Sequence, residues 1–147
     1  MTLYRLIGKV CRSPMAEFVM KDLVKKAGLA DQFEIASAAT SREEIGNPVH
    51  RGTRNKLKQY DISVDGKYAV QMTSADYRYY DYIIAMERYN LRNMEQFVHG
   101  DPAHKVHLLL DFTDRKGDIA DPWYTGNFDE TYDDVLEGCQ GLLAHIR

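Results

Sequence analysis

Strand-like and helix-like segments alternate along this chain, and that alternation restricts the fold more than any other feature of the sequence. The clearest buried strand is residues 81–86 (DYIIAM), where three apolar residues stand in a row. The sequence predicts three more strands, at 2–7 (TLYRLI), 33–38 (FEIASA) and 106–110 (VHLLL). This alternation predicts an α/β fold with a parallel sheet, and 147 residues suit a single domain that spans 1–147.

Helical periodicity fills the segments between the predicted strands. The first helix is predicted to begin with Ser13 as its N-cap and Pro14 as its first helical residue, and to stop at Gly28. Further helices are predicted over residues 49–60, 90–98 and 129–146. Residues 114–127 carry glycine and proline and are predicted to form a loop. The tyrosines around the third strand are predicted to be strand and core material: Tyr77, Tyr79, Tyr80 and Tyr82.

The first strand-to-helix turn, residues 6–17 (LIGKVCRSPMAE), has the features of a phosphate-binding loop. Ligands of open α/β sheets bind beyond the carboxyl ends of the strands, where this turn lies. A helix N-terminus offers unpaired N–H groups and a partial positive charge. Gly8 lets the backbone approach an anion or take a positive φ, and Arg12 can hold two phosphate oxygens with its planar fork. A capped helix with a surface arginine would give the same pattern.

A second candidate segment is Asp121-Pro122-Trp123-Tyr124. Proline fixes the backbone beside the aspartate, and an aspartate near a leaving-group oxygen can act as a general acid. The two aromatic residues can flank a flat ligand. An ordinary surface turn is the alternative interpretation, because Asp-Pro is common in turns.

Composition argues against several other classes of protein. The net charge of −3 disfavours nucleic-acid binding, and no apolar run approaches the length of a membrane span. The first ten residues lack the features of a signal peptide, so a cytoplasmic location is expected. Cys11 and Cys139 form no disulfide framework, and the histidines and cysteines show no metal-binding spacing. No metal or cofactor is therefore predicted.

Together the motifs resemble those of the low-molecular-weight protein tyrosine phosphatases, over nearly the whole chain. Four family motifs are matched in order: C-L-G-N-x-C-R-S-P-M-A-E by Gly8 and residues 11–17, S-A-G/A-T and the following Gly-x-Pro by 37–40 and 46–48, F-D-Y-I-x-x-M-D-x-x-N-L by 80–91, and D-P-W/Y-Y by 121–124. Likeness is weakest over the first seven residues, where Arg5 interrupts an otherwise apolar strand.

The resemblance implies a fold, a reaction and a set of site residues. The fold is a Rossmann-like, three-layer α/β arrangement, in which helices flank both faces of a four-stranded parallel sheet. The reaction is hydrolysis of phosphotyrosine through a cysteinyl-phosphate intermediate, without a metal. The partners are a phosphotyrosine protein or a small aryl phosphate, with inorganic phosphate or a similar oxyanion as a simple ligand.

The resemblance also assigns roles to individual residues. Arg12 would hold the phosphoryl oxygens, Asp121 would act as acid and then as base, Ser37 would support the loop, and Trp123 and Tyr124 would flank the substrate. The phosphate-binding loop would consist of Ile7, Gly8, Lys9, Val10, Cys11, Arg12 and Ser13.

The chain departs from the family at the position that matters most for the chemistry. The family's nucleophilic cysteine lies six positions before the arginine, and Leu6 stands there. A leucine side chain has no lone pair, so we expect hydrolysis to be impaired. Cys11 matches the family's redox partner of the nucleophile and is not expected to replace it. Lys9 stands where the family has a loop asparagine, and Glu87 where it often has aspartate.

Other functions remain open at this point. A pseudophosphatase that binds phosphate or phosphotyrosine without cleaving it is the main alternative. A protein arginine phosphatase ranks lower, because relatives of that kind carry threonine where this chain has Ile7. Arsenate reductase also ranks lower, because it needs further redox cysteines in a mobile segment, and Cys139 falls on the predicted last helix.

Overall fold

A computed structural model describes residues 2–8, 12–42, 45–115 and 117–146, apart from the side chains of Trp123, Tyr124 and Ile146. Its strands are β1 (Thr2–Ile7), β2 (Phe33–Ala38), β3 (Tyr82–Ala85) and β4 (Val106–Leu108). Its helices are α1 (Ser13–Lys26), α2 (Arg51–Lys58), α3 (Ser74–Tyr79), α4 (Arg88–Val98), α5 (Pro122–Thr125) and α6 (Phe128–Ile146), with 3-10 turns η1 (Ala30–Gln32) and η2 (Leu109–Phe112).

The four strands form one parallel sheet, as predicted, and their order in the sheet is β2-β1-β3-β4. β1 is central and is hydrogen-bonded on both sides, so that Leu6 lies opposite Ser37 of β2 and Ile84 of β3. The strand order reverses between β1 and β3, and ligands of such sheets bind at this switch point. The carboxyl end of β1 therefore lies where a ligand is expected.

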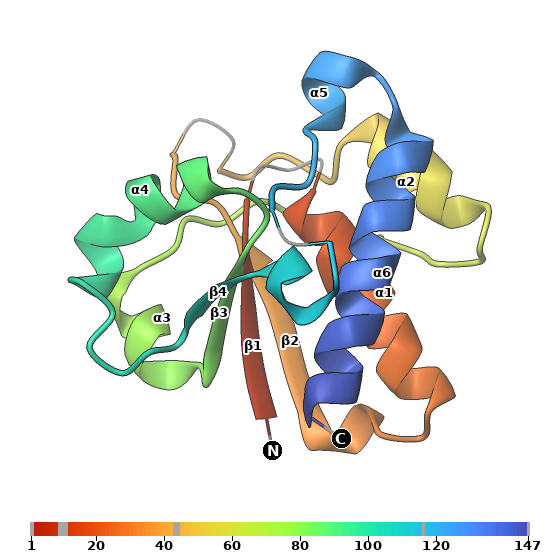
Figure 1. The fold of residues 1–147 in the computed structure, drawn as a ribbon. Helices are drawn as coiled ribbons and strands as arrows, with labels where there is room; N and C mark the ends of the chain where they lie inside the picture. Colours follow the sequence, from red (N-terminus) through yellow and green to blue (C-terminus); the bar gives the residue numbers. More distant parts are fainter. Residues whose placement is uncertain (1, 9–11, 43–44, 116, 147) are drawn as a thin grey trace.

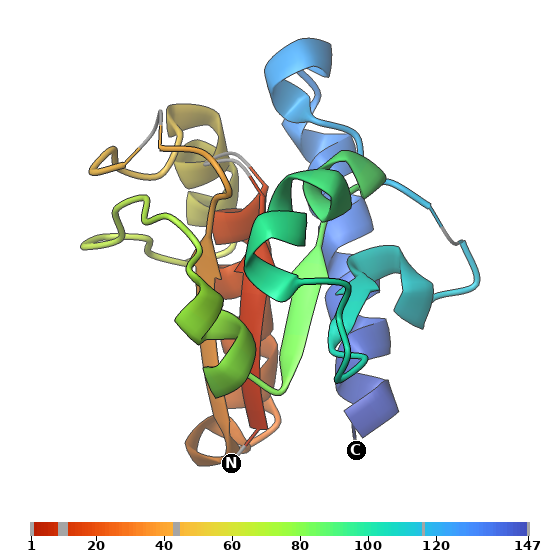
Figure 2. The same cartoon turned by 90° about the vertical axis from the view of Figure 1, so that its left-hand side faces the viewer.

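Helices cover both faces of the sheet and make three layers (Figures 1 and 2). α1 and α6 lie on one face, and α3 and α4 lie on the other. Each face has its own apolar core because side chains alternate along a strand. Tyr4 and Leu6 point to the α1 and α6 side, while Ile7 points to the α3 and α4 side.

Arg5 is accommodated within β1 by a polar group on the α3 side. Its guanidinium forms an ion pair with Asp76 at 3.4 Å and lies 5.2 Å from the centre of the Tyr80 ring. Asp76 also closes a capping box with Thr73 at the start of α3. The strand is therefore formed despite the charge that interrupts its apolar pattern.

Three sequence predictions need correction. Tyr77 and Tyr79 lie in α3, not in strand, because the Thr73–Asp76 capping box starts a helix there. The predicted loop 114–127 contains the short helix α5. The N-cap of α1 is Arg12, not Ser13, because the helix begins at Ser13; Pro14 is therefore its second residue, not its first.

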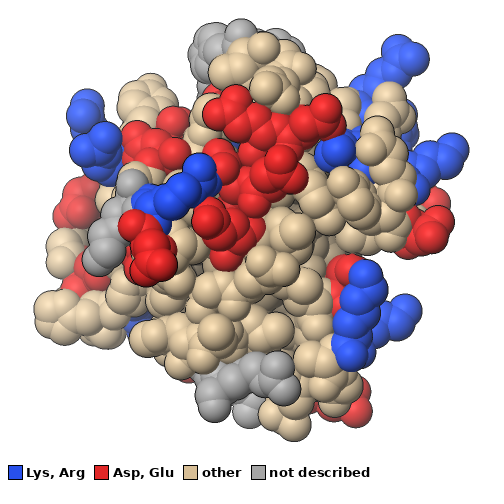
Figure 3. All heavy atoms as spheres, turned by 45° about the vertical axis from the view of Figure 1, so that its right-hand side comes forward, with Lys and Arg blue, Asp and Glu red and all other residues tan. Residues whose placement is uncertain are grey.

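Acidic side chains gather on one part of the surface. Figure 3 is turned so that the side carrying α6 comes forward, and Asp and Glu concentrate in the upper half of that view. Within the described ranges, no helix combines the length and apolar character that a bilayer span requires.

Candidate active site

Arg12 is the centre of the candidate site, and its side chain is fully buried. Nη1 donates to the Ile119 carbonyl at 2.8 Å, and Nη2 donates to Glu87 Oε1 at 2.9 Å. Nη2 also lies 3.7 Å from Asp121 Oδ2, whose side chain is 8% exposed. A buried guanidinium needs such partners, since an unpaired charge in the interior is costly. The structure thus brings together the side chains of Arg12 and Asp121, the two residues that the resemblance places at one site.

One donor of Arg12 is left without an acceptor. Among the residues that the structure describes, nothing accepts a hydrogen bond from its buried Nε. Nε and one Nη form an edge of the guanidinium that matches two oxygens of a carboxylate or phosphate. Buried donors are normally satisfied, so this Nε–H group is a candidate donor to a bound oxyanion or an ordered water.

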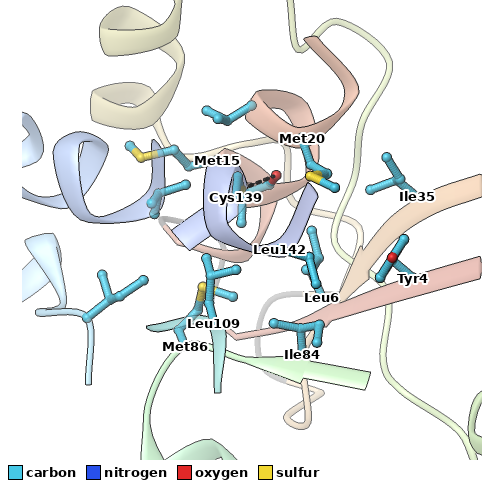
Figure 4. Packing of buried hydrophobic residues seen from close by; sticks show 14 of the residues in the cluster. Tyr4, Leu6, Met15, Met20, Ile35, Ile84, Met86, Leu109, Cys139 and Leu142 are labelled. Atoms are coloured by element: carbon cyan, nitrogen blue, oxygen red, sulfur yellow. Dashed lines mark hydrogen bonds between the residues drawn. The ribbon is translucent and has the colours of Figure 1, made fainter. Parts of the chain in front are cut away.

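Position 6 carries an entirely apolar group. Leu6 is fully buried and belongs to the core between the sheet and helices α1 and α6. Figure 4 shows its side chain beside Ile84 and Leu142, with Cys139 nearby. The side chain therefore has a packing role and offers no electron pair to phosphorus.

Hydrogen bonds hold the turn between β1 and α1 at Gly8 and Ser13, which lie on either side of its undescribed residues. The Gly8 N–H donates to the Ala38 carbonyl at 3.1 Å, and the Ser13 hydroxyl donates to the Gly8 carbonyl at 3.2 Å. A Cβ on Gly8 would lie 3.2 Å from Met86 Cγ and 3.3 Å from Ser13 Cβ. Gly8 is not among the residues with positive φ, so close approach is its reason for being glycine.

The structure describes only some of the predicted site residues in full. Lys9, Val10 and Cys11 lie outside the described residues, so their predicted roles in the loop stay predictions. Trp123 and Tyr124 lie in α5, directly after Asp121, and their predicted contact with substrate also stays a prediction. Ile7 is fully buried on the α4 side of the sheet.

Ser37 lies at the carboxyl end of β2, and its hydroxyl donates to Glu17 Oε1 at 2.6 Å. Burial of Glu17 favours its neutral form, but its lysine partners and the Ser37 hydroxyl outweigh that effect and lower the pKa of the carboxyl group. Lys67 completes this cluster, with Nζ 2.9 Å from Glu17 Oε1. Ser37 is thus held by residues of α1 and of the segment before α3.

Sequence reasoning missed three residues around the site. Glu87 seemed a minor substitution, yet it is the carboxylate nearest to Arg12. Glu17 lies in the first matched motif and had no assigned role, although a glutamate on the inner side of a helix was a usable signal. Lys67 carried no local signal, because it reaches its partners from a distant part of the chain.

Cys139 is fully buried in the core, and burial raises the pKa of its thiol. Its Sγ lies 3.7 Å from the Ala16 carbonyl oxygen. A protonated thiol in this position is unsuited to redox exchange. In the described part of the chain, no group of three or more histidine, cysteine, aspartate or glutamate side chains is arranged to hold a metal ion.

Comparison with known proteins gives one consistent family. The family model described as low molecular weight phosphotyrosine protein phosphatase matches residues 5–147. The chain is 38% identical to the low molecular weight protein-tyrosine-phosphatase YfkJ of Bacillus subtilis, over 99% of this chain and 94% of that protein.

Solved structures agree with that family. The crystal structure of YfkJ superposes with a TM-score of 0.92, covering 99% of this chain and 92% of that one. SP-PTP, a low molecular weight protein tyrosine phosphatase from Streptococcus pyogenes, is 41% identical with a TM-score of 0.89, over 100% of this chain and 94% of that one. DARP, a drosophila arginine phosphatase, is 30% identical with a TM-score of 0.88, over 99% and 97% of the two chains.

Proposed function

Because the chain belongs to the low molecular weight phosphotyrosine protein phosphatase family, we propose that it recognises phosphotyrosine in proteins but hydrolyses it poorly, since Leu6 stands at the nucleophile position. Its ligands would be phosphotyrosine proteins, small aryl phosphates and inorganic phosphate, and it would act in the cytoplasm. The convergence of Arg12 and Asp121 from separate loops carries this proposal.

The reaction of the family assigns each of these residues a step. A thiolate attacks phosphorus, the bond from phosphorus to the phenolic oxygen breaks, and Asp121 gives its proton to that oxygen. Water then attacks phosphorus, the sulfur–phosphorus bond breaks, and the Asp121 carboxylate takes a proton from the water. Arg12 would hold the phosphoryl oxygens through both steps. The hydrogen bonds of its two Nη atoms to the Ile119 carbonyl and to Glu87 fix the orientation of the guanidinium, and with it the Nε–H group that has no acceptor among the described residues.

This chain lacks the electron pair for the first step. Leu6 is saturated and packed into the core, so the proposal leaves binding and acid catalysis in place without a nucleophile. Direct attack by water remains, but it lacks the proximity that a fixed nucleophile gives.

The test is hydrolysis of p-nitrophenyl phosphate by three proteins: the chain as it stands, Leu6→Cys and Leu6→Ser. Leu6→Ser is the matched control, because it opens a similar space without a thiolate. We expect background activity from the unaltered chain and at least about 100-fold more from Leu6→Cys than from Leu6→Ser. Both variants remove most of a fully buried leucine side chain, at a cost of about 2–5 kcal/mol of stability, so rates are compared per folded molecule.

Two outcomes would contradict the assignment of Leu6. Rapid turnover by the unaltered chain that is abolished by Cys11→Ser would show that another cysteine acts as nucleophile. Rapid turnover that survives Cys11→Ser would show that the reaction needs neither residue. Each result would replace the impaired-enzyme proposal.

A binding module is the second candidate: Leu6 supplies no nucleophile, whereas Arg12 Nε, which has no acceptor among the described residues, can still donate to a bound oxyanion. If Leu6→Cys stays inactive while the unaltered chain binds phosphotyrosine peptides, capture without cleavage becomes the better description. Phosphoarginine peptides belong in the same binding series, because one similar structure is titled an arginine phosphatase. Ile7 at the position after Leu6 supports phosphotyrosine in that comparison.

A further inference from the structure

A buried carboxylate lies behind the phosphate-binding loop, and three donors from three segments hold it. Glu17 of α1 is 2% exposed. Its Oε1 accepts from Ser37 Oγ at 2.6 Å and lies 2.9 Å from Lys67 Nζ, and its Oε2 accepts from Lys21 Nζ at 2.6 Å. Two ammonium groups and one carboxylate leave this cluster with a net positive charge.

The two lysines differ in what else they touch. Lys21 lies one turn from Glu17 on the same helix, and its side chain is 44% exposed. Lys67 comes from the segment between α2 and α3, is 16% exposed, and also donates to the Ser37 carbonyl at 3.0 Å. Of these two lysines, only Lys67 therefore contacts both Glu17 of α1 and Ser37 at the carboxyl end of β2.

A short path of hydrogen bonds leads from Lys67 to the loop. Lys67 holds the Ser37 carbonyl, and the next carbonyl, of Ala38, accepts from the Gly8 N–H at 3.1 Å. The Gly8 carbonyl accepts in turn from the Ser13 hydroxyl. Gly8, Ser13, Ser37 and Lys67 also line one small cavity. Lys67 thus lines the same small cavity as Gly8 and Ser13, the described ends of the loop.

We propose that Lys67 is a positioning residue of the phosphate-binding loop: it fixes the carboxyl end of β2 through Ser37 and Glu17, and its surplus positive charge favours a bound oxyanion. This inference rests on the proposed function, because it assigns the loop to phosphate. A purely structural cross-link would stabilise the fold without changing affinity for an oxyanion.

Lys67→Met and Lys21→Met form the matched pair that tests this role. Each removes one ammonium group from Glu17, but only Lys67→Met also removes the hydrogen bond to the Ser37 carbonyl. We expect Lys67→Met to raise the dissociation constant for inorganic phosphate about tenfold, and Lys21→Met to change it less than about threefold. Lys67→Arg keeps the charge and is expected to retain most of the affinity. Titration followed by NMR measures all three with the full chain.

Hydrogen exchange of the Gly8 amide gives a readout that needs no ligand. After correction for global stability measured by urea unfolding, we expect this amide to exchange about tenfold faster in Lys67→Met than in Lys21→Met. Equal phosphate affinities and equal Gly8 exchange in the two methionine variants would overturn the positioning role. If Lys67→Met does not fold, Lys67→Arg is compared with Lys21→Met instead. Weaker phosphate binding by Lys67→Arg than by Lys21→Met would then count against the positioning role of Lys67.

The two proposals fail in different ways. An unaltered chain that binds neither phosphate nor phosphotyrosine peptides would remove the proposed function, whatever the lysine variants do. Gly8 exchange would still report whether Lys67 holds the loop. Intact phosphate binding with equal effects of the two lysine substitutions would remove only the positioning role.

Discussion

Replacing Gly141 by alanine is expected to destabilise this protein, although the same change in an open helix would stabilise it. Gly141 lies in α6 where that helix packs against η2. A Cβ here would lie 2.2 Å from the Phe112 carbonyl oxygen and 2.9 Å from its carbonyl carbon. These are backbone atoms that no side-chain rotation can remove, so η2 or α6 would have to shift.

The magnitude follows from two opposing terms. Alanine is favoured over glycine in a helix interior by about 0.5–1 kcal/mol. Forcing extra volume into a packed interior costs about 1–3 kcal/mol, and contact with fixed backbone belongs to the upper part of that range. We therefore expect a net loss of about 1–2 kcal/mol. For a chain of 147 residues this lowers Tm by roughly 3–8 °C.

Urea unfolding followed by circular dichroism measures this loss, with thermal unfolding as a second estimate. Gln140→Ala is the control on the same helix, because Gln140 is exposed and the change is expected to stay within about 0.5 kcal/mol. A Gly141→Ala variant as stable as the unaltered chain would refute the close approach of η2 to α6.

Three further predictions follow from buried groups. Glu17→Gln is expected to lower the free energy of unfolding at pH 7, and this loss is expected to shrink as the pH falls below 4.5, the usual pKa of a glutamate carboxyl group. The pKa of Glu17 is lowered in the folded protein, so its ionised form contributes stability above that pH, and the contribution is lost as the folded protein takes up the proton. Urea unfolding at pH 7 and at acid pH measures the loss, and an equal loss at both would contradict this reasoning. In a Cys11→Ser background, which leaves one thiol, Cys139 is expected to resist Ellman's reagent in the folded protein and to react once guanidinium unfolds it, since it is fully buried and burial raises the pKa of its thiol. Rapid labelling of this folded variant would show that the α1–α6 core opens. Arg12→Lys is expected to weaken phosphate binding at least about tenfold and to lower the stability of the fold. A lysine ammonium group lacks the planar guanidinium that donates to Glu87 and the Ile119 carbonyl at the same time. Unchanged affinity in a phosphate titration would show that Arg12 does not belong to the site.

Local patterns predicted the strands and most of the helices. β1 and β2 have the predicted bounds. The predicted strand 106–110 ends at Leu108, where a 3-10 turn begins. Short helices were the main failure: α3 was mistaken for strand because tyrosine favours strands, and the capping residues that start it were overlooked.

The candidate site was predictable only where residues lie within motifs. Arg12 and Asp121 were paired through the family resemblance, and the structure brings their side chains to 3.7 Å. Glu87 and Lys67 were missed because their contacts join segments far apart in the chain, which no local pattern encodes. Leu6 is a different case: its type was evident from the sequence, but its place in the core was not.

The contact between Arg12 and Ile119 spans 107 residues, and this has a consequence during synthesis of the chain. All four strands leave the ribosome before residue 119 does. Contacts of such long sequence separation form late, since chain entropy must be lost before they contribute. We expect a nascent chain to assemble much of the sheet first and to acquire affinity for phosphate only after its last third has been translated.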